Sequence, residues 1–369
     1  MPIKTATITF HASHNYGSML QAYALQQVLF RLGYDNEIIN LRTECQRQVY
    51  KYPETFDYKG IKAFLKSILY IPYVKNLQKK YALFEQFLES SLVLTREYKS
   101  LEELQETGFD YDCYISGGDQ IWNTTPKDFD WSFYLPFVQK GKRISYAVSM
   151  GPKAEEQVFN RDRIREYLLK YNSISVREEG TASLISILID KQVGLTLDPA
   201  LLLTSEEWSK NFSQKPIVEG DYIFLYVPYF MRSVYEMSEY LSKRLKMKVV
   251  VSLLGGYKSL LYSFDKCLAV GPWEFLNLLK HAKLVVSGSF HALVFSVLFH
   301  VPFFAVNGDK DNRMITFLKN LHLLDRTINT EDRTHKWENS FQCDFAYADL
   351  FLSQQRLDSF QYLKESIEG

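Results

Sequence analysis

The chain has 369 residues, of which 46% are hydrophobic and 23% charged, so it is long enough for two α/β domains and is neither disordered nor collagen-like. Its 43 basic and 43 acidic residues give a formal net charge of zero, which argues against a nucleic-acid partner, because nucleic-acid binders need a clustered positive field. Aromatic residues make up 15% of the chain; such rings fill protein cores, but they also stack on sugar faces, so the excess weakly favours a carbohydrate ligand.

The first forty residues predict a βαβ unit. Residues 5–10 have the pattern of a strand, 11–17 of a polar loop, 20–32 of a helix that stops at Gly33, and 37–41 of a second strand. The opening segment lacks the pattern of a signal peptide, and no run approaches the ~18–20 apolar residues that span a membrane. We therefore expect a cytoplasmic protein.

The rest of the chain alternates strand and helix patterns. Residues 56–107 are mostly helical in pattern, and the predicted strands lie at 113–115, 143–148, 173–176, 222–227, 248–253, 283–286 and 303–306. This alternation predicts an α/β protein with two doubly wound parallel sheets. The expected domains are a Rossmann-like domain at 1–205 on the acceptor side, a second at 220–345 on the donor side, and a helix at 346–369 that crosses back.

Polar residues gather where the predicted strands end. Ligands of parallel sheets bind at the carboxyl ends of strands, where helix N-termini present free N–H groups. The sharpest such junction is Ser287–Ala292, in which His291 opens an apolar helix beside Ser289 and Phe290. His291 there suits an anion site with an acid/base. A helix-capping or core histidine is the alternative.

Arg177 follows directly on another apolar strand. Its guanidinium could hold a carboxylate or phosphate through two parallel hydrogen bonds. An ion pair with Glu178 or Glu179 is an equally good interpretation from the sequence.

Two further junctions are candidates for substrate contacts. After 113–115 come Gly118, Asp119, Gln120 and Trp122, in which glycine permits close approach and tryptophan offers a stacking face; a turn with core aromatics is the alternative. After the first strand come Asn15, Tyr16 and Gly17.

The loop after the first strand also holds His11 and His14. The sequence assigns them no role. No carboxylate or third ligand stands at a spacing from them that favours a metal site. The chain has neither GxGxxG nor GxxxxGK[ST], so dinucleotide and P-loop nucleotide sites lose support.

Residues 59–80 hold six lysines and no acidic residue, interleaved with apolar residues. This segment could form a basic amphipathic face for peripheral contact with anionic lipid. A helix packed on the core with a solvated lysine side is the alternative.

Taken together, the segments resemble the polysaccharide pyruvyltransferase family. The matching segments, in family order, are ITF…NYGSMLQAYALQQVLFRLGY, SGGDQIWN, SYAVSMG, SVREEGTASL, LTLDPALLL, GPWEFLNLLKHAKLVVSGSFHALVFSVLFHVPF and DNRMITFLKNLHLLDR. The resemblance implies a GT-B-type fold, with two Rossmann-like domains facing across a cleft. It also implies phosphoenolpyruvate as donor and no cofactor. The expected acceptor is a sugar diol of a capsule, an exopolysaccharide or its lipid-linked precursor, which would receive pyruvate as a ketal.

The resemblance also implies roles for single residues. Arg177 is expected to hold the donor, and His291 to act as acid/base beside the same anion. Some members have Arg where this chain has Ser289, and Arg313 is our candidate for the missing charge. The full set of expected substrate-binding residues is Ser289, Phe290, Arg313, Asn15, Tyr16, Gly17, Gly118, Asp119, Gln120, Trp122 and Ser149.

Two other functions stay open at this point. A GT-B glycosyltransferase that uses a nucleotide sugar would suit the same cleft. A non-catalytic carbohydrate-binding protein would explain the aromatic residues, but it leaves Arg177 and His291 at strand ends without a purpose.

Overall fold

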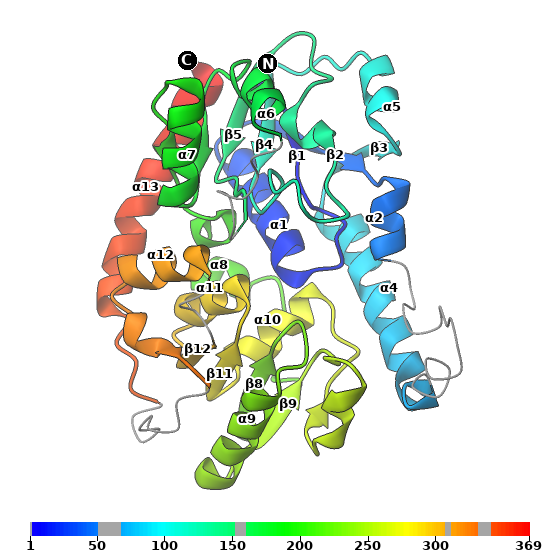
Figure 1. Ribbon diagram of the computed structural model, residues 1–369, viewed down its shortest axis with the longest axis vertical. Coiled ribbons are helices and arrows are strands. Elements are labelled where there is room, and N and C mark those ends of the chain that lie inside the picture. The colour runs from blue at the N-terminus through cyan, green and yellow to red at the C-terminus, as the bar shows by residue number, and fades with distance from the viewer. Residues whose placement is uncertain (1, 51–67, 152–159, 307–310, 331–340) are drawn as a thin grey trace. The chain divides into compact units, whose positions relative to one another are not determined.

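The computed structural model describes residues 2–50, 68–151, 160–306, 311–330 and 341–369, in which the chain forms two compact units (Figure 1). Unit 1 contains the described residues up to Tyr50, together with Leu88–Leu203 and Phe351–Gly369. Unit 2 contains residues 68–87 and Thr204–Leu350. The sequence-based division places 68–87 with the first domain, whereas in the structure this segment groups with unit 2.

Unit 1 is built on a five-stranded parallel sheet in the order β3-β2-β1-β4-β5. Its strands are β1 (Lys4–Ile8), β2 (Asp35–Leu41), β3 (Leu94–Tyr98), β4 (Cys113–Gly117) and β5 (Lys142–Tyr146). Two short parallel strands, β6 (Ser175–Val176) and β7 (Gly194–Leu195), continue it through a bridge between Val148 and Val176. The helical elements are α1 (Tyr16–Arg31), α2 (Glu44–Val49), α5 (Leu101–Glu106), η3 (Trp131–Tyr134), α6 (Arg161–Leu168), α7 (Glu179–Ile189), η6 (Pro199–Leu202) and, from Phe351 on, α13 (Ala346–Glu368).

Unit 2 is built on a six-stranded parallel sheet in the order β10-β9-β8-β11-β12-β13. Its strands are β8 (Tyr222–Tyr226), β9 (Lys248–Val251), β10 (Asp265–Lys266), β11 (Leu284–Ser287), β12 (Phe303–Val306) and β13 (Thr327–Ile328). The helical elements are η2 (Ile71–Tyr73), α4 (Val74–Ser91, up to Phe87 in this unit), α8 (Ser205–Ser209), α9 (Arg232–Leu245), η7 (Tyr257–Leu261), α10 (Pro272–Lys280), α11 (Phe290–Leu298), α12 (Asn312–Asn320) and η9 (Leu324–Arg326).

The two sheets share one winding pattern. In each, the first strand of the unit lies in the middle, with the second strand on one side and the fourth on the other. The prediction of two doubly wound parallel sheets is therefore confirmed. The point where the winding reverses lies between β1 and β4 in unit 1 and between β8 and β11 in unit 2, and ligands of such sheets bind there.

Burial explains which strands the sequence predicts well. Every residue of β8, β11 and β12 is buried, so these strands appear in the sequence as continuous apolar runs. The edge strand β3 lies inside a stretch that the sequence predicts as helical. Its sequence, LTREY, is half polar and mostly not buried, so it lacks the apolar run that marks the central strands. The two-residue strands β10 and β13 are too short to give a periodic signal.

The N-terminus of α1 also differs from the prediction. The helix starts at Tyr16 rather than at residue 20, because the side chain of Asn15 caps it. Its oxygen accepts hydrogen bonds from the backbone N–H groups of Gly17 and Ser18.

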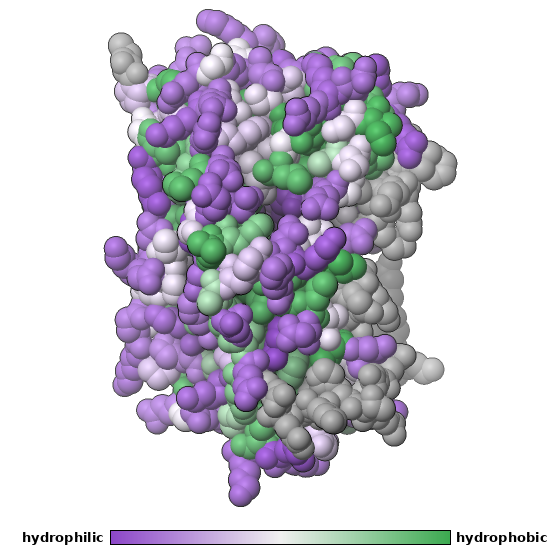
Figure 2. All heavy atoms as spheres, turned by 90° about the vertical axis from the view of Figure 1, so that its left-hand side faces the viewer, coloured by the Kyte–Doolittle hydropathy of each residue, from purple (hydrophilic) through white to green (hydrophobic). Residues whose placement is uncertain are grey.

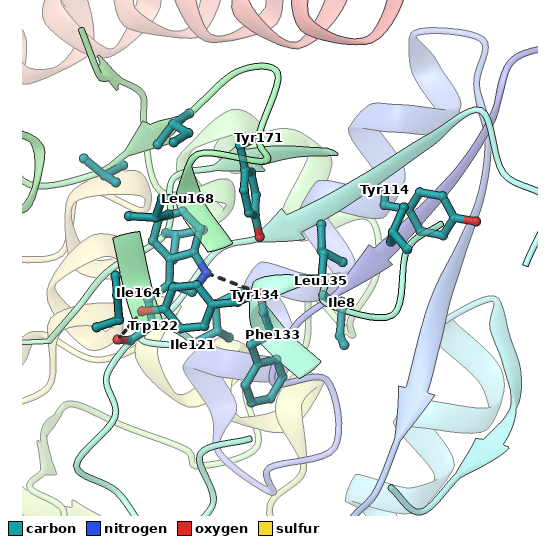
Figure 3. Close-up of a cluster of buried hydrophobic side chains, with 14 of the residues drawn as sticks. Ile8, Tyr114, Ile121, Trp122, Phe133, Tyr134, Leu135, Ile164, Leu168 and Tyr171 are labelled. Atoms are coloured by element: carbon teal, nitrogen blue, oxygen red, sulfur yellow. Dashed lines mark hydrogen bonds between the residues drawn. The ribbon is translucent and has the colours of Figure 1, made fainter. Parts of the chain in front are cut away.

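Aromatic rings fill much of the unit 1 core (Figure 3). Trp122 stacks on Tyr134 at 5.2 Å between ring centroids and meets Tyr171 edge-on at 5.6 Å. The Trp122 indole N–H donates to the carbonyl of Phe133, so its polar atom is satisfied inside the core. Much of the aromatic excess seen in the sequence therefore serves packing.

No helix within the described part of the chain is long and apolar enough to cross a membrane. Figure 2 shows one face of the molecule, on which hydrophobic side chains form patches between hydrophilic ones. The expected cytoplasmic location stays a prediction.

Candidate functional site

The predicted site residues lie at the carboxyl ends of parallel strands in both units. In unit 1, Asn15, Gly118, Ser149 and Arg177 follow β1, β4, β5 and β6, which are neighbours in the sheet. In unit 2, Ser289 and the residues after it follow β11. Arg177 and His291 belong to different units, so each is described within its own unit.

Arg177 is the centre of a buried ion cluster in unit 1. Its Nε donates to Glu178 at 2.8 Å and its Nη1 to Asp198 at 2.5 Å, and its Nη2 lies 3.5 Å from Asp119. The four side chains are between 1% and 8% exposed. Each nitrogen of the guanidinium group is thus directed at a carboxylate of its own unit.

The electrostatics of the cluster keep Arg177 charged. Burial by itself lowers the pKa of the guanidinium, but the charges of Glu178, Asp198 and Asp119 outweigh burial and raise the pKa above its usual value. One cation faces three carboxylates, so the carboxylates depend on Arg177 and on other donors for stabilisation.

Other groups of unit 1 supply those donors. Thr181 donates its hydroxyl to Glu178 at 3.2 Å, and the backbone N–H of Ala200 donates to Asp198 at 3.0 Å. Ser18, in the first turn of α1, donates its hydroxyl to Asp119. The cluster therefore ties the N-terminus of α1 to the turns after β4, β6 and β7.

The turn after β4 contains two consecutive residues with positive φ angles. Gly118 and Asp119 have φ angles of +65° and +54°, in the left-handed region. A Cβ on Gly118 would lie 1.7 Å from Oε1 of Gln21, a buried side chain held by two hydrogen bonds, so glycine is favoured there by both this contact and its positive φ. The close approach that the sequence predicts at Gly118 is made by the side chain of Gln21.

The remaining predicted residues of unit 1 make local contacts. Asn15 is exposed and caps α1, whereas Tyr16 is buried. Gln120 accepts from Asn123 at 3.3 Å, and buried Ser149 accepts from the N–H of Gly151 at 3.0 Å.

Trp122 does not present a face to solvent. Its side chain is fully buried in the aromatic cluster of unit 1. This burial argues against the expected grip on a sugar and supports the alternative of a core aromatic.

His11, to which the sequence assigns no role, is buried where β1 ends. Its Nδ1 lies 3.1 Å from the carbonyl of Thr9 and its Nε2 lies 2.9 Å from Oδ1 of Asn40. These contacts fix the ring between the first two strands of the sheet, which suits a structural histidine. His14 has a φ of +46° and lies 6.3 Å from the ring of Tyr50.

In unit 2 the predicted residues form one group around the start of α11. Ser289 is the N-cap residue, and its side chain makes no capping hydrogen bond. Its backbone N–H donates to the hydroxyl of Ser287 at 3.0 Å. His291 lies in the first turn, 7% exposed, with its ring 5.3 Å from that of Phe290. The helix starts at Phe290, so His291 is inside its first turn rather than ahead of it.

Arg313 lies close to the same group. Its guanidinium carbon is 6.0 Å from the centre of the Phe290 ring. Its Nε and Nη2 both donate to the carboxylate of Asp311, at 3.0 and 2.6 Å. Arg313 thus lies near Phe290 with its guanidinium paired to Asp311, and its role as the missing cation stays a prediction.

Among the residues of the unit 1 cluster that the sequence-based site omits are Asp198 and Ser18. Asp198 stands in the DPALLL segment, where an acid just before proline begins η6 and could have been recognised as a strand-end residue. Ser18 gives no such signal, because a serine in the first helical turn is common.

A family model described as polysaccharide pyruvyl transferase matches residues 15–310. No curated protein shows significant similarity to the sequence.

Solved structures resemble the fold across the whole chain. S. aureus MnaA in its co-structure with UDP has a TM-score of 0.59 at 10% identity, covering 100% of this chain and 98% of that one. The N-terminal domain of Candida albicans trehalose-6-phosphate phosphatase has a TM-score of 0.53 at 8% identity, covering 100% and 96%. UDP-GlcNAc 2-epimerase from Neisseria meningitidis, bound to UDP-GlcNAc, has a TM-score of 0.51 at 11% identity, covering 98% and 100%. At these identities the likeness concerns the fold alone, and it confirms a GT-B-type α/β protein with two Rossmann-like units.

Proposed function

Because the chain belongs to the polysaccharide pyruvyl transferase family, we propose that it moves pyruvate from phosphoenolpyruvate to a sugar diol as a cyclic ketal and releases phosphate. The acceptor is a surface polysaccharide or its precursor. Family membership favours this function over the nucleotide-sugar glycosyltransferase that the fold alone also suits, since one fold hosts many chemistries.

The start of α11 is the observation on which the donor site rests. The first N–H groups of a helix attract anions, and the Ser289 hydroxyl is not used to cap them. His291 lies in the same turn, and Arg313 stands beside Phe290. This group supports binding of the donor phosphate next to an acid/base.

The reaction then balances without a further reactant. His291, as imidazolium, gives a proton to the methylene carbon of phosphoenolpyruvate, and C2 becomes an oxocarbenium-like centre. One sugar hydroxyl adds to C2, and its proton returns to the neutral imidazole of His291. The C–O bond to phosphate breaks, and phosphate leaves towards the α11 N–H groups. The second hydroxyl adds to C2, and its proton goes to the departing phosphate.

We assign Arg177 a positioning role in unit 1. Its contacts with Asp119, Glu178 and Asp198 hold the turn after β4, and that turn together with Asn15 at the start of α1 forms our proposed acceptor side. The resemblance implies instead that Arg177 holds the donor. The affinity of an Arg177→Lys variant for phosphoenolpyruvate separates the two roles: it is unchanged for positioning and at least tenfold weaker for a direct contact.

A lipid-linked acceptor would bring the protein to the membrane surface. Of the basic segment 59–80, residues 59–67 lie outside the described part of the chain. In the remainder, Ile68, Leu69 and Ile71 are 45%, 47% and 59% exposed. These exposed apolar side chains near Lys75 suit peripheral contact with anionic lipid. Binding to vesicles with and without phosphatidylglycerol tests this part of the proposal.

The function itself is tested by titration calorimetry and phosphate release. We expect phosphoenolpyruvate to bind and UDP-GlcNAc not to bind. With a suitable sugar, phosphate release should depend on both donor and acceptor. The His291→Gln variant should lose turnover, whereas His300→Gln, at a half-exposed histidine of the same unit, should not. Binding of UDP-GlcNAc without any binding of phosphoenolpyruvate would refute the proposal.

A further inference from the structure

A lysine of α4 reaches the carboxyl end of strand β9. The ammonium group of Lys80 donates to the backbone carbonyl of Ser252 at 3.4 Å. Ser252 is the first residue after β9, so Lys80 lies at the edge of the unit 2 sheet where ligands of parallel sheets bind. Both residues belong to unit 2.

The pairing of neighbouring strands relates the position of Ser252 to the start of α11. Leu225 pairs with Val251 and Tyr226 with Ser287, so one step beyond Val251 brings Ser252 level with Tyr226 and Ser287. Side chains at one level of a parallel sheet point to the same face. The row therefore runs from Ser252, past the buried ring of Tyr226 on β8, to Ser287 just before the turn that precedes α11.

The length of this row suits a small molecule. Two strand spacings amount to about 10 Å. A three-carbon donor with hydrogen bonds of about 2.9 Å at both ends spans a similar length.

The hydroxyl of Ser252 is one of five buried hydroxyls that form no hydrogen bond among the described residues. The residue itself is fully buried. A buried hydroxyl without a partner costs free energy, so such groups are rare and frequently mark a position where a ligand or water completes the bonding.

The Lys80 side chain is also in an unfavourable environment. The residue is half-buried, and its ammonium group lies between the Ser252 carbonyl, at 3.4 Å, and the Phe84 ring, at 5.9 Å. Burial lowers the pKa of Lys80 to about 8. An ammonium next to an unsatisfied hydroxyl supplies charge and a hydrogen-bond donor, which is what a buried anionic group requires.

We propose that Lys80 and Ser252 form an anion subsite at the carboxyl end of β9, which takes a carboxylate or phosphate group of the substrate. Under the proposed function, on which this identification rests, the group is the carboxylate of phosphoenolpyruvate, and its phosphate lies at the start of α11. The same chemistry would take the diphosphate of a nucleotide or lipid-linked sugar, so the test includes those sources.

The test labels lysines of the intact protein with pyridoxal 5′-phosphate, an aldehyde that carries a phosphate group. Borohydride then fixes the imine, and mass spectrometry of peptides locates it. A pKa near 8 gives Lys80 about 200 times more neutral amine at pH 7.5 than an ordinary lysine has. Lys75 and Lys79, both exposed on the same helix, are matched internal controls. We expect Lys80 to react at least tenfold faster than either, and phosphoenolpyruvate to suppress its labelling selectively.

The outcomes separate the subsite from the donor assignment. Protection by inorganic phosphate or UDP-GlcNAc, without protection by phosphoenolpyruvate, supports the anion subsite and refutes the donor of the proposed function. Labelling of Lys80 at the rate of Lys75 and Lys79, with no protection by any anion, overturns the subsite.

Two variants give a second measurement. Lys80→Met and Ser252→Ala should each raise the dissociation constant of the protecting anion at least tenfold, while far-UV circular dichroism shows an unchanged fold. Unchanged affinity in both variants refutes the subsite.

Discussion

Replacing Arg177 by methionine tests the ion cluster of unit 1 through stability alone. The change keeps much of the side-chain volume but leaves Asp119, Glu178 and Asp198 without their shared cation, at side-chain exposures of 8%, 5% and 1%. Removal of one partner from a buried pair costs about 3–5 kcal/mol. Three carboxylates depend on Arg177, so we expect the upper part of this range.

The loss should depend on pH. Without Arg177 the clustered carboxylates repel one another, so their pKa values in the folded variant rise above the unfolded values. The folded variant then binds more protons than the unfolded chain, and its stability falls as the pH rises from the unfolded pKa, about 4, through the raised folded values. The variant should therefore lie closer to wild type at pH 5 than at pH 7.5.

Hydrogen exchange measured by mass spectrometry is the suitable assay, because it separates the two units. Amides of β4 and β6 should exchange faster in the variant, while β8 and β11 of unit 2 serve as the internal control. Adding Glu178→Gln and Asp198→Asn to Arg177→Met should restore part of the protection, since the uncompensated charge is gone. A decrease in the free energy of unfolding below about 1 kcal/mol at both pH values would contradict this prediction. Removing a buried cation that three anions share should cost more than that.

Three further predictions concern other positions. The His291→Gln variant should lose turnover at least a hundredfold and keep its affinity for phosphoenolpyruvate within threefold, measured by phosphate release and calorimetry; equal losses in both would remove its acid/base role. The Gly118→Ala variant should lose about 2–4 kcal/mol in urea unfolding, because its Cβ would lie 1.7 Å from Gln21 Oε1 at a φ of +65°, and a loss below about 0.5 kcal/mol would contradict this. The Lys80→Met variant should be about 1–3 kcal/mol more stable than wild type at pH 7, because the folded pKa of Lys80 lies near 8 and below its unfolded value of 10.5. Wild type then gains stability relative to the variant as the pH rises from 8 to 10.5, and a pH-independent difference in melting temperature would contradict the shifted pKa.

Much of the fold could be predicted from the sequence because its central strands are buried on both faces. The runs YIFLY of β8 and FFAV of β12 are apolar throughout, with Asp221 just before the first and Asn307 just after the second, so they are evident without a structure. By contrast, β3 is half polar at the edge of its sheet, and only its pairing with β2 makes it a strand.

For the candidate site, the sequence predicts the positions of residues at strand ends but not their surroundings. Strand ends can be located from the pattern, and so Arg177, Asp119 and His291 could be assigned to them. What surrounds each side chain depends on tertiary packing. The sequence shows Arg177 beside Glu178, but not that Asp198 and Asp119 come to the same guanidinium. Lys80 gave no separate signal either, because it is the last of a run of lysines, and only its contact with Ser252 distinguishes it.

The most direct test follows the donor carbon itself. The purified protein is incubated with phosphoenolpyruvate labelled with 13C at C2 and with a panel of sugars that carry neighbouring hydroxyl pairs, and the reaction is followed by NMR. The proposed function predicts that the enol carbon signal is replaced by that of a ketal carbon bonded to two sugar oxygens, with one phosphate released per ketal. Labelled phosphoenolpyruvate that stays intact, while a nucleotide sugar is consumed with the same acceptors, would contradict it.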